Sequence, residues 1–256
     1  MKIIGHKGAG VSASENTASG LKQAMRLGLD AVEIDVWPTA DREFVLFHDA
    51  HLGRITGHGG WTNSLTSDEL SSLPIRPDLN DGVPNERLLL LSEALDLIAG
   101  KLDLILEVKR TRHELERYAW VEERLWQTLT EHGAEDWTLV ISFDHRSLYD
   151  LRCLAPELHI GMLYAGEWLR LWDEIESLTP DALLPHWAQT TPELVDAAHH
   201  ANLKVYPWAV DHRDWMERFV TMGVDGIITD HPETLLEVLQ RPRQTLPIER
   251  GFGGTT

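Results

Sequence analysis

Eight short, apolar runs rich in β-branched residues recur along the chain, and longer stretches of helical periodicity lie between most of them. Strand–helix alternation is typical of parallel strands joined by crossover helices, and eight such units predict a closed (β/α)8 barrel, or TIM barrel. An open, doubly wound parallel sheet is the alternative. The strand-like runs are Lys2–His6, Ala31–Trp37, Leu102–Lys109, Thr138–Phe143, His159–Tyr164, Ala182–Trp187, Lys204–Val210 and Gly226–Asp230. Helices are expected at Thr17–Leu27, His113–His132, Thr191–Ala201 and Asp214–Met222.

The length of 256 residues suits a single barrel, and 43% hydrophobic residues are enough for one large core. The alternation breaks after the second strand, where Phe44–His48 predicts an extra short strand. Residues 49–92 follow, and their glycines and prolines exclude a single helix. We interpret this segment as a small insertion over the barrel mouth. We therefore expect one TIM-barrel domain over residues 1–240 and a peripheral C-terminal tail over 241–256.

The chain has 41 acidic and 23 basic residues, which gives a formal net charge of −18. A nucleic-acid partner is not expected, because binding a phosphate backbone needs a basic surface. No apolar run is long enough for a leader or a membrane span, and Cys153 is the single cysteine, so no intramolecular disulfide can form. We expect a soluble, cytoplasmic protein without stable membrane insertion. The sequence does not specify the oligomeric state.

Charged residues interrupt two of the apolar strands. Side chains two apart on a strand share a face, so Glu33 and Asp35 point the same way, as do Glu107 and Lys109. Charges inside apolar strands are costly unless they are paired or bind a metal ion, and pairing with Lys109 leaves two carboxylates uncompensated. We therefore predict a site for a divalent metal ion, Mg²⁺ or Ca²⁺, at the three acids. Zn²⁺ is less suited, because thiolates are absent.

Two histidines end strand-like runs. His6 closes the run KIIGH and His48 closes EFVLFH. The carboxyl ends of barrel strands form the catalytic face, and histidine exchanges protons near neutral pH. The pair is therefore suited to act as acid and base on opposite sides of a reacting phosphorus. A structural, hydrogen-bonded role is the alternative for each.

Five motifs follow one another from His6 to about Pro232: HKGAG with ENT, VEIDV, VLFHDAHLGRITGHGG, LILEVK and GVDGIITDHP. Together and in this order they resemble the glycerophosphodiester phosphodiesterase family, which is related to barrel phospholipases. The resemblance implies a TIM-barrel enzyme that uses a divalent metal ion. It also implies a small phosphodiester substrate, hydrolysed to sn-glycerol 3-phosphate and an alcohol.

On this resemblance, the acids Glu33, Asp35 and Glu107 would ligate the metal ion. His6 and His48 would serve as general acid and base, and we favour His48 as the acid. The attacking group would be either water or the glycerol 2-hydroxyl.

Three further residues would bind the substrate. Lys109 would hold a phosphate oxygen, Trp208 would wall the pocket, and Lys7 stands where the family usually has arginine. Lysine keeps the charge but lacks the bidentate geometry. Asp211 takes a place that the family often gives to asparagine, and Asn16 of ENT either orients the site or belongs to a helix cap.

Four tryptophans have two interpretations: they line the mouth and bind an apolar alcohol or acyl chain, or they pack in the core or on the surface. They are Trp61, Trp168, Trp172 and Trp187.

Three other functions stay open. A phosphodiesterase acting on lysophospholipids or other lipid phosphodiesters would have a wide, apolar pocket mouth. A barrel that binds phosphate compounds without turnover is supported only by Lys7. A lyase or aldolase would use Lys109 as a Schiff-base amine.

Overall fold

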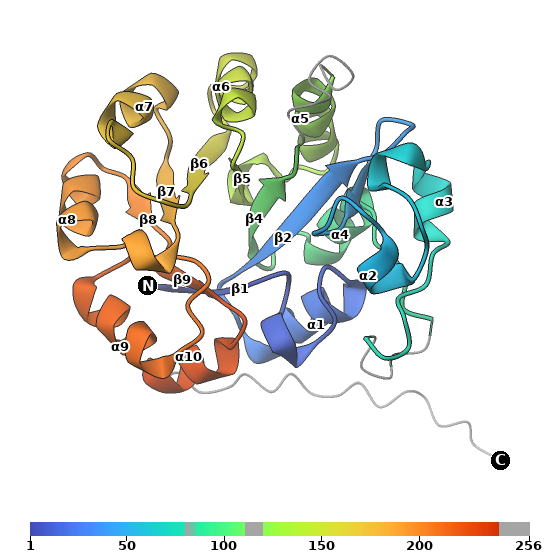
Figure 1. Ribbon diagram of the computed structural model, residues 1–256, viewed down its shortest axis with the longest axis horizontal. Coiled ribbons are helices and arrows are strands. Elements are labelled where there is room, and N and C mark those ends of the chain that lie inside the picture. The colour runs from blue at the N-terminus through green and yellow to red at the C-terminus, as the bar shows by residue number, and fades with distance from the viewer. Residues whose placement is uncertain (80–82, 84, 111–119, 241–256) are drawn as a thin grey trace.

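Eight parallel strands surrounded by helices make up the computed structural model of the chain, which describes residues 1–79, 83, 85–110 and 120–240 (Figure 1). The hydrogen-bonded order is β8-β7-β6-β5-β4-β2-β1-β9, and the short β3 pairs antiparallel with β2. The strands are β1 Lys2–Gly5, β2 Ala31–Pro38, β3 Phe44–Leu46, β4 Asp103–Val108, β5 Thr138–Ser142, β6 His159–Tyr164, β7 Ala182–Pro185, β8 Lys204–Val205 and β9 Gly226–Thr229. This arrangement confirms the predicted TIM-barrel class, including the extra strand after the second one.

Backbone hydrogen bonds between the first and last strands of this order close the barrel. The Asp225 N–H donates to Val205 O at 3.0 Å, and the Ile228 N–H donates to Pro207 O at 3.1 Å. The regular part of β8 is shorter than the predicted strand Lys204–Val210, because Pro207 has no N–H to donate. The ring is therefore nearly closed rather than a uniform ladder.

The helices lie outside the strands, and three of the four predicted helices appear within two residues of the expected bounds. The barrel helices are α1 Ala18–Leu27, α4 Leu91–Ile98, α5 Val121–Glu131, α6 His145–Leu154, α7 Leu171–Leu178, α8 Pro192–His200, α9 Arg213–Met222 and α10 Pro232–Val238. The predicted helix His113–His132 is found as α5, and its residues 113–119 lie outside the described part of the chain. Caps explain where α1 begins and ends: Thr17 accepts from the Gly20 N–H, and Gly28 takes the left-handed conformation.

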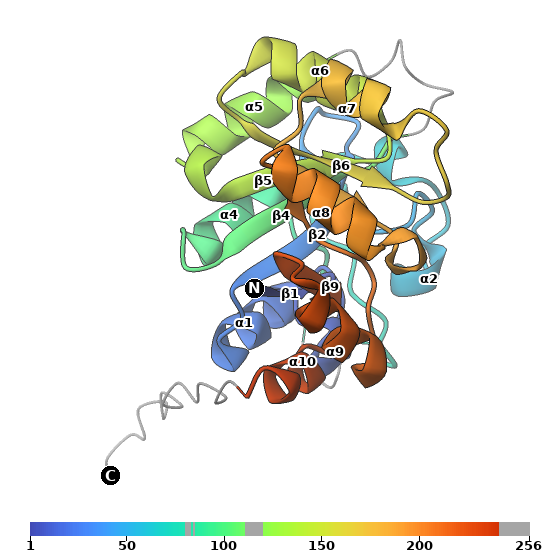
Figure 2. The same cartoon turned by 90° about the vertical axis from the view of Figure 1, so that its left-hand side faces the viewer.

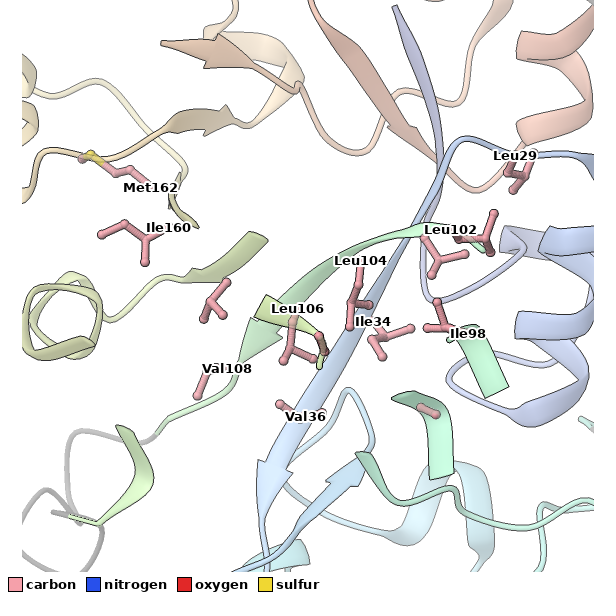
Figure 3. Close-up of a cluster of buried hydrophobic side chains, with 14 of the residues drawn as sticks. Leu29, Ile34, Val36, Ile98, Leu102, Leu104, Leu106, Val108, Ile160 and Met162 are labelled. Atoms are coloured by element: carbon pink, nitrogen blue, oxygen red, sulfur yellow. The ribbon is translucent and has the colours of Figure 1, made fainter. Parts of the chain in front are cut away.

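Alternation along each strand separates two cores. The outer core lies between strands and helices, and Figure 3 shows Ile34 and Val36 of β2 close to Leu104 and Leu106 of β4 within it. Burying one such side chain stabilises the fold by about 1.5–3 kcal/mol. The inner core fills the barrel with Ile4, Ala31, Ile105, Ile141, Leu163, Ala182, Leu184, Tyr206 and Ile228. At Gly161, a Cβ would lie 2.5 Å from Leu184 Cδ1, so only glycine leaves room for this inner packing.

The described part of segment 49–92 has a core of its own. It contains α2 Gly53–Thr56 and α3 Ser67–Ser71, and its apolar side chains pack against β3 and Trp37. A capping box between Thr66 and Glu69 begins α3. The predicted tail, 241–256, lies outside the described residues. No helix in the described ranges is long and apolar enough to cross a bilayer.

Candidate active site

A cavity of about 260 Å³ at the carboxyl ends of the strands is lined by six of the eight residues proposed from the sequence. These six are His6, Glu33, His48, Glu107, Lys109 and Trp208, and the remaining lining residues are Ile141, Phe143, Leu163, His186, Ala209 and Ile228. A larger cavity of about 480 Å³ lies at the opposite mouth, around Lys2, Thr138 and Tyr206, and contains none of the proposed residues. Because barrel enzymes bind substrate at the carboxyl ends of their strands, we place the site in the smaller cavity.

Three buried carboxylates meet at the base of this site. Oxygen atoms of Glu33, Asp35 and Glu107 lie within 4.8 Å of one another. They converge because β2 and β4 are neighbours, with Asp35 opposite Glu107 in the register. Lys109 Nζ lies 2.8 Å from Asp35 Oδ1 and 2.7 Å from Glu107 Oε1, so one ammonium group faces three carboxylates. Glu33 accepts from the backbone N–H of Lys7 at 3.1 Å.

The acids of this cluster differ in protonation. Burial and the charge of Asp35 raise the pKa of Glu33 to about 8. Burial also raises the pKa of Glu107, which reaches about 7 although Lys109 opposes the shift. Burial acts against the ionised form of Asp35 too, but the charge of Lys109 outweighs it and lowers that pKa. The cluster therefore holds protons that a divalent cation would displace, and its oxygen donors fit Mg²⁺ or Ca²⁺.

The ammonium group of Lys109 stays charged. Burial alone would lower its pKa, but Asp35 and Glu107 outweigh that effect and raise the pKa well above the ordinary value. A protonated amine is not nucleophilic, which argues against a Schiff base at this residue.

Divalent metal is expected to stabilise the protein more at high pH than at low pH. The raised pKa values of Glu33 and Glu107 mean that the metal-free folded state binds more protons than the unfolded state between about pH 4.5 and about pH 8. Stability without metal therefore falls as pH rises through this window, and metal binding removes the penalty. We expect the rise in Tm on adding saturating Ca²⁺ or Mg²⁺ to be at least about twofold larger at about pH 8.5 than at about pH 5.5. Equal increases at both pH values, by thermal unfolding against EDTA, would contradict the assignment.

Each of the two histidines has a carboxylate at Nδ1. His6 Nδ1 lies 2.8 Å from Asp230 Oδ1, and His48 Nδ1 lies 2.8 Å from Asp49 Oδ1. A carboxylate at Nδ1 fixes the tautomer with hydrogen on that atom and leaves Nε2 free for proton transfer. His6 Nε2 lies 3.9 Å from Glu33 Oε2. Burial would lower the pKa of His6, but the hydrogen bond with Asp230 and the charge of Glu33 outweigh it and raise the pKa to about 9.

Asp230→Asn is expected to lower the pKa of His6 from about 9 toward 6.5 in the metal-free protein, because a neutral amide no longer stabilises the imidazolium ion. Loss of the fixed tautomer should also reduce kcat by about tenfold or more. A histidine titration followed by NMR measures the first effect. Asp96→Asn is the matched control, since Asp96 pairs with His132 at 2.8 Å outside the cavity. If the pKa of His6 were unchanged in Asp230→Asn, Asp230 would not be the residue that stabilises the charged ring of His6.

Arg54 of the insertion braces the second histidine through Asp49. Its Nε donates to Asp49 Oδ2 at 2.6 Å, and its Nη2 donates to Glu15 Oε1 at 2.6 Å. The hydrogen bonds from Arg54 lower the pKa of Asp49 to about 2, so Asp49 is ionised where it meets His48. The insertion and the loop after β1 are thus joined beside the cavity.

Asn16 and Lys7 have roles that the sequence left open. Asn16 Nδ2 donates to Asp35 Oδ2 at 2.9 Å and its Oδ1 accepts from the Asp35 N–H at 3.0 Å, so Asn16 orients a site carboxylate while Thr17 caps α1. Lys7 does not line the central cavity. Its Nζ lies 3.9 Å from Glu15 Oε2, and it borders an adjacent hollow with Arg54.

Several residues of the site were not proposed from the sequence. Asp49 directly follows His48 and Asp230 ends a strand in the TDHP string, so their positions were visible, but their partners were not. Nothing in the sequence singles out His186 or Phe143. His186 Nδ1 accepts from the Ala188 N–H at 3.3 Å, and the ring packs edge-on against Trp208.

Comparison with known proteins identifies the family of the chain. The sequence profile described as the glycerophosphoryl diester phosphodiesterase family matches residues 6–234. A glycerophosphodiester phosphodiesterase from Caldanaerobacter subterraneus subsp. tengcongensis is 34% identical over 239 residues, which cover 93% of this chain and 98% of that protein.

Solved structures share the fold. A phosphodiesterase from Oleispira antarctica, in complex with the product sn-glycerol-3-phosphate, aligns with a TM-score of 0.86 and 25% identity over 94% of this chain and 97% of that chain. A putative glycerophosphoryl diester phosphodiesterase from Silicibacter pomeroyi aligns with a TM-score of 0.83 and 27% identity over 93% and 92% of the two chains. The chain therefore belongs to the glycerophosphoryl diester phosphodiesterase family and is a hydrolase.

Proposed function

We propose that this enzyme hydrolyses glycerophosphodiesters to sn-glycerol 3-phosphate and an alcohol, with a divalent metal ion and two histidines. The observation that carries the proposal is the convergence of three buried carboxylates, His6 and His48 around one cavity. The product found in the Oleispira antarctica structure supports the choice of substrate class.

Glu33, Asp35 and Glu107 would hold the metal ion. The donor set consists of carboxylate oxygens, and its negative charge exceeds what Lys109 neutralises, so the residues fit Mg²⁺ or Ca²⁺. When bound, the ion supplies positive charge that stabilises the extra negative charge on a phosphate as it becomes five-coordinate. Asn16 keeps Asp35 in place through two hydrogen bonds.

The chain's own groups supply proton transfer and further charge. The attacking oxygen belongs to water or to the glycerol 2-hydroxyl. One histidine takes the proton of that oxygen at Nε2 as the oxygen forms the new bond to phosphorus. The other histidine donates a proton from Nε2 to the leaving alkoxide as its bond to phosphorus breaks. Asp230 and Asp49 hold the two rings at Nδ1, so Nε2 is the transferring atom in each. Lys109, charged and beside the acids, is placed to donate to a phosphate oxygen.

The opposite wall of the cavity is apolar and would contact the carbon part of the substrate. Trp208 is fixed there, because its Nε1 donates to Leu184 O at 2.8 Å and Phe143 packs edge-on against its ring. Leu163 and Ile228 extend this wall. One observation favours a second candidate, a phosphodiesterase acting on lysophospholipids: Phe143 lines the cavity and is also exposed, so the apolar wall reaches the surface.

The test measures sn-glycerol 3-phosphate released from glycerophosphocholine and glycerophosphoethanolamine, with Mg²⁺, with Ca²⁺ and with EDTA. We expect release that requires metal. Full activity in EDTA would remove the metal from the proposal. If choline were released from lysophosphatidylcholine and no product from the two glycerophosphodiesters, lysophospholipids would replace glycerophosphodiesters as the proposed substrates. If the substrates bound but none gave product, the result would support a non-catalytic barrel.

A further inference from the structure

Large apolar side chains are exposed mainly at the end of the barrel that holds the cavity. In the described part of the chain nine such side chains are exposed, and two of them, Tyr149 and Leu154, lie on α6. The other seven belong to the loops after the strands, to the start of α7 or to the insertion. We call these seven the apolar rim: Val11, Trp61, Leu79, Phe143, Trp168, Leu169 and Trp172. Exposed apolar surface concentrated on one face is typical of an interaction site.

The loop from β6 to α7 carries the most prominent part of the apolar rim. Leu169 is 105% exposed, so its side chain contacts almost nothing in the folded protein. Its neighbour Trp168 anchors the loop, because the indole packs on His145 at 5.2 Å and on Tyr164 at 6.1 Å between ring centroids. Figure 2 shows this loop and α2 of the insertion on the same side of the barrel. This loop and the insertion therefore both expose rim side chains at the end of the barrel that holds the cavity.

Two of the segments that bear the rim, around Trp61 and around Trp168 and Leu169, are electrically neutral, whereas Leu79, Phe143 and Trp172 have acidic neighbours in the sequence. Residues 57–63, around Trp61, contain no acidic or basic residue apart from His58, and in 165–170 the charges of Glu167 and Arg170 cancel. The whole chain carries −18. An anionic surface would repel such a protein, and the rim segments carry no net positive charge that would offset this repulsion. Tryptophan and leucine on neutral loops fit the headgroup region of a zwitterionic lipid layer.

The apolar rim is continuous with the cavity. Phe143 is 47% exposed and also lines the cavity, where its ring packs on Trp208 with centroids 5.5 Å apart. A molecule with a phosphate head and an apolar tail could therefore place its head near Lys109 and its tail along Phe143 toward the rim.

We propose that the apolar rim docks the barrel mouth onto the surface of a zwitterionic phospholipid layer. The docking is peripheral, because only side chains of the rim would enter the headgroup region. It goes beyond the proposed hydrolysis and can hold or fail independently of it, since adhesion to lipid requires neither the metal ion nor the histidines.

The experiment compares Leu169→Glu with Leu154→Glu, two exposed leucines changed in the same way on different faces. The full chain is sedimented with phosphatidylcholine vesicles, with and without added anionic lipid and salt. We expect the wild-type protein and Leu154→Glu to bind, and Leu169→Glu to lose about tenfold or more in partition coefficient. Binding should be insensitive to salt and should not increase with anionic lipid. Trp61→Ser, on the other side of the mouth, should also weaken binding.

Three results of the vesicle assay would overturn the proposal: no binding of the wild-type protein to any vesicle, binding only to anionic vesicles, or equal losses of binding in the two leucine variants. A fourth would be a wild-type dimer that does not bind vesicles and that Leu169→Glu converts to a monomer. The last result would assign the apolar rim to self-association instead. Circular dichroism and hydrolysis of dissolved glycerophosphocholine distinguish a folded variant from an unfolded one, and failure of that hydrolysis in the wild type would count against the proposed function alone.

Discussion

Glu33→Gln is expected to lower kcat/KM by at least about 10³-fold while raising the Tm of the metal-free protein by about 2–4 °C. Activity falls because the metal site loses a carboxylate. Stability rises because Glu33 is buried beside Asp35, and burial together with that charge raises its pKa to about 8, so its ionised form is unfavourable without metal. Glutamine keeps an oxygen that can accept the Lys7 N–H, which donates to Glu33 in the wild type. The measurements are steady-state kinetics with metal and thermal unfolding in EDTA at about pH 8.5.

Glu86→Gln is the matched control for this variant. Glu86 is as buried as the site acids, and within the described residues its Oε2 has no hydrogen-bond partner, but it lies in the insertion away from the cavity. We expect its kcat/KM to stay within about twofold of the wild-type value. If Glu33→Gln kept wild-type activity, or if both variants lost activity equally, Glu33 would not be a metal ligand.

Removing either histidine ring is expected to lower kcat/KM by about 10²–10⁴-fold, because each supplies one proton transfer in the same step. His6→Ala and His48→Ala together should cost about as much as one of them alone, since residues that act as a unit are not additive. His58→Ala is the control, because His58 is an exposed histidine of the insertion. Rates are measured with metal at saturation, so that metal affinity does not enter the comparison.

The two histidine variants should separate when the leaving group changes. A p-nitrophenyl phosphodiester releases a phenolate that needs no proton, so the variant lacking the general acid should recover most of its rate on that substrate, and the variant lacking the base should not. The variant that recovers identifies the acid, for which the sequence favoured His48. If neither recovered, neither histidine would act as the acid.

Periodicity predicted the strands and the face that the acids share, although it left an open sheet as an alternative to the barrel. In β2 every second residue packs against the helices, so Glu33 and Asp35 had to face the interior. The same alternation directs Glu107 of β4, and Lys109 directly after it, toward the interior. The barrel brings these residues together because β2 and β4 are adjacent, although the insertion separates them in the sequence. The main difference in the strands is β8, where Pro207 limits the regular ladder.

Partner choice among side chains could not be predicted in the same way. His6 pairs with Asp230, which is 224 positions away, and Arg54 pairs with Glu15 across two loops. Such pairs depend on the path of loop backbones: Gly10, at φ 58°, lets the chain approach the Asp230 backbone so closely that a Cβ would lie 2.2 Å from its carbonyl oxygen. Periodicity carries no information about that approach. The substrate-binding role of Lys7 stays a prediction, since its ammonium group is near Glu15 rather than in the cavity.

The bridge from Glu15 through Arg54 to Asp49 has a consequence for the exchange of segments between relatives. A transplanted insertion that lacks an arginine at this place would leave Glu15 with Lys7 alone and Asp49 without its guanidinium partner, so the carboxylate that holds His48 would be less firmly fixed. The loop after β1 and the first turn of the insertion therefore have to be exchanged together. Chimeras that swap residues 49–92 should retain activity only when Glu15 and Arg54 come from compatible parents.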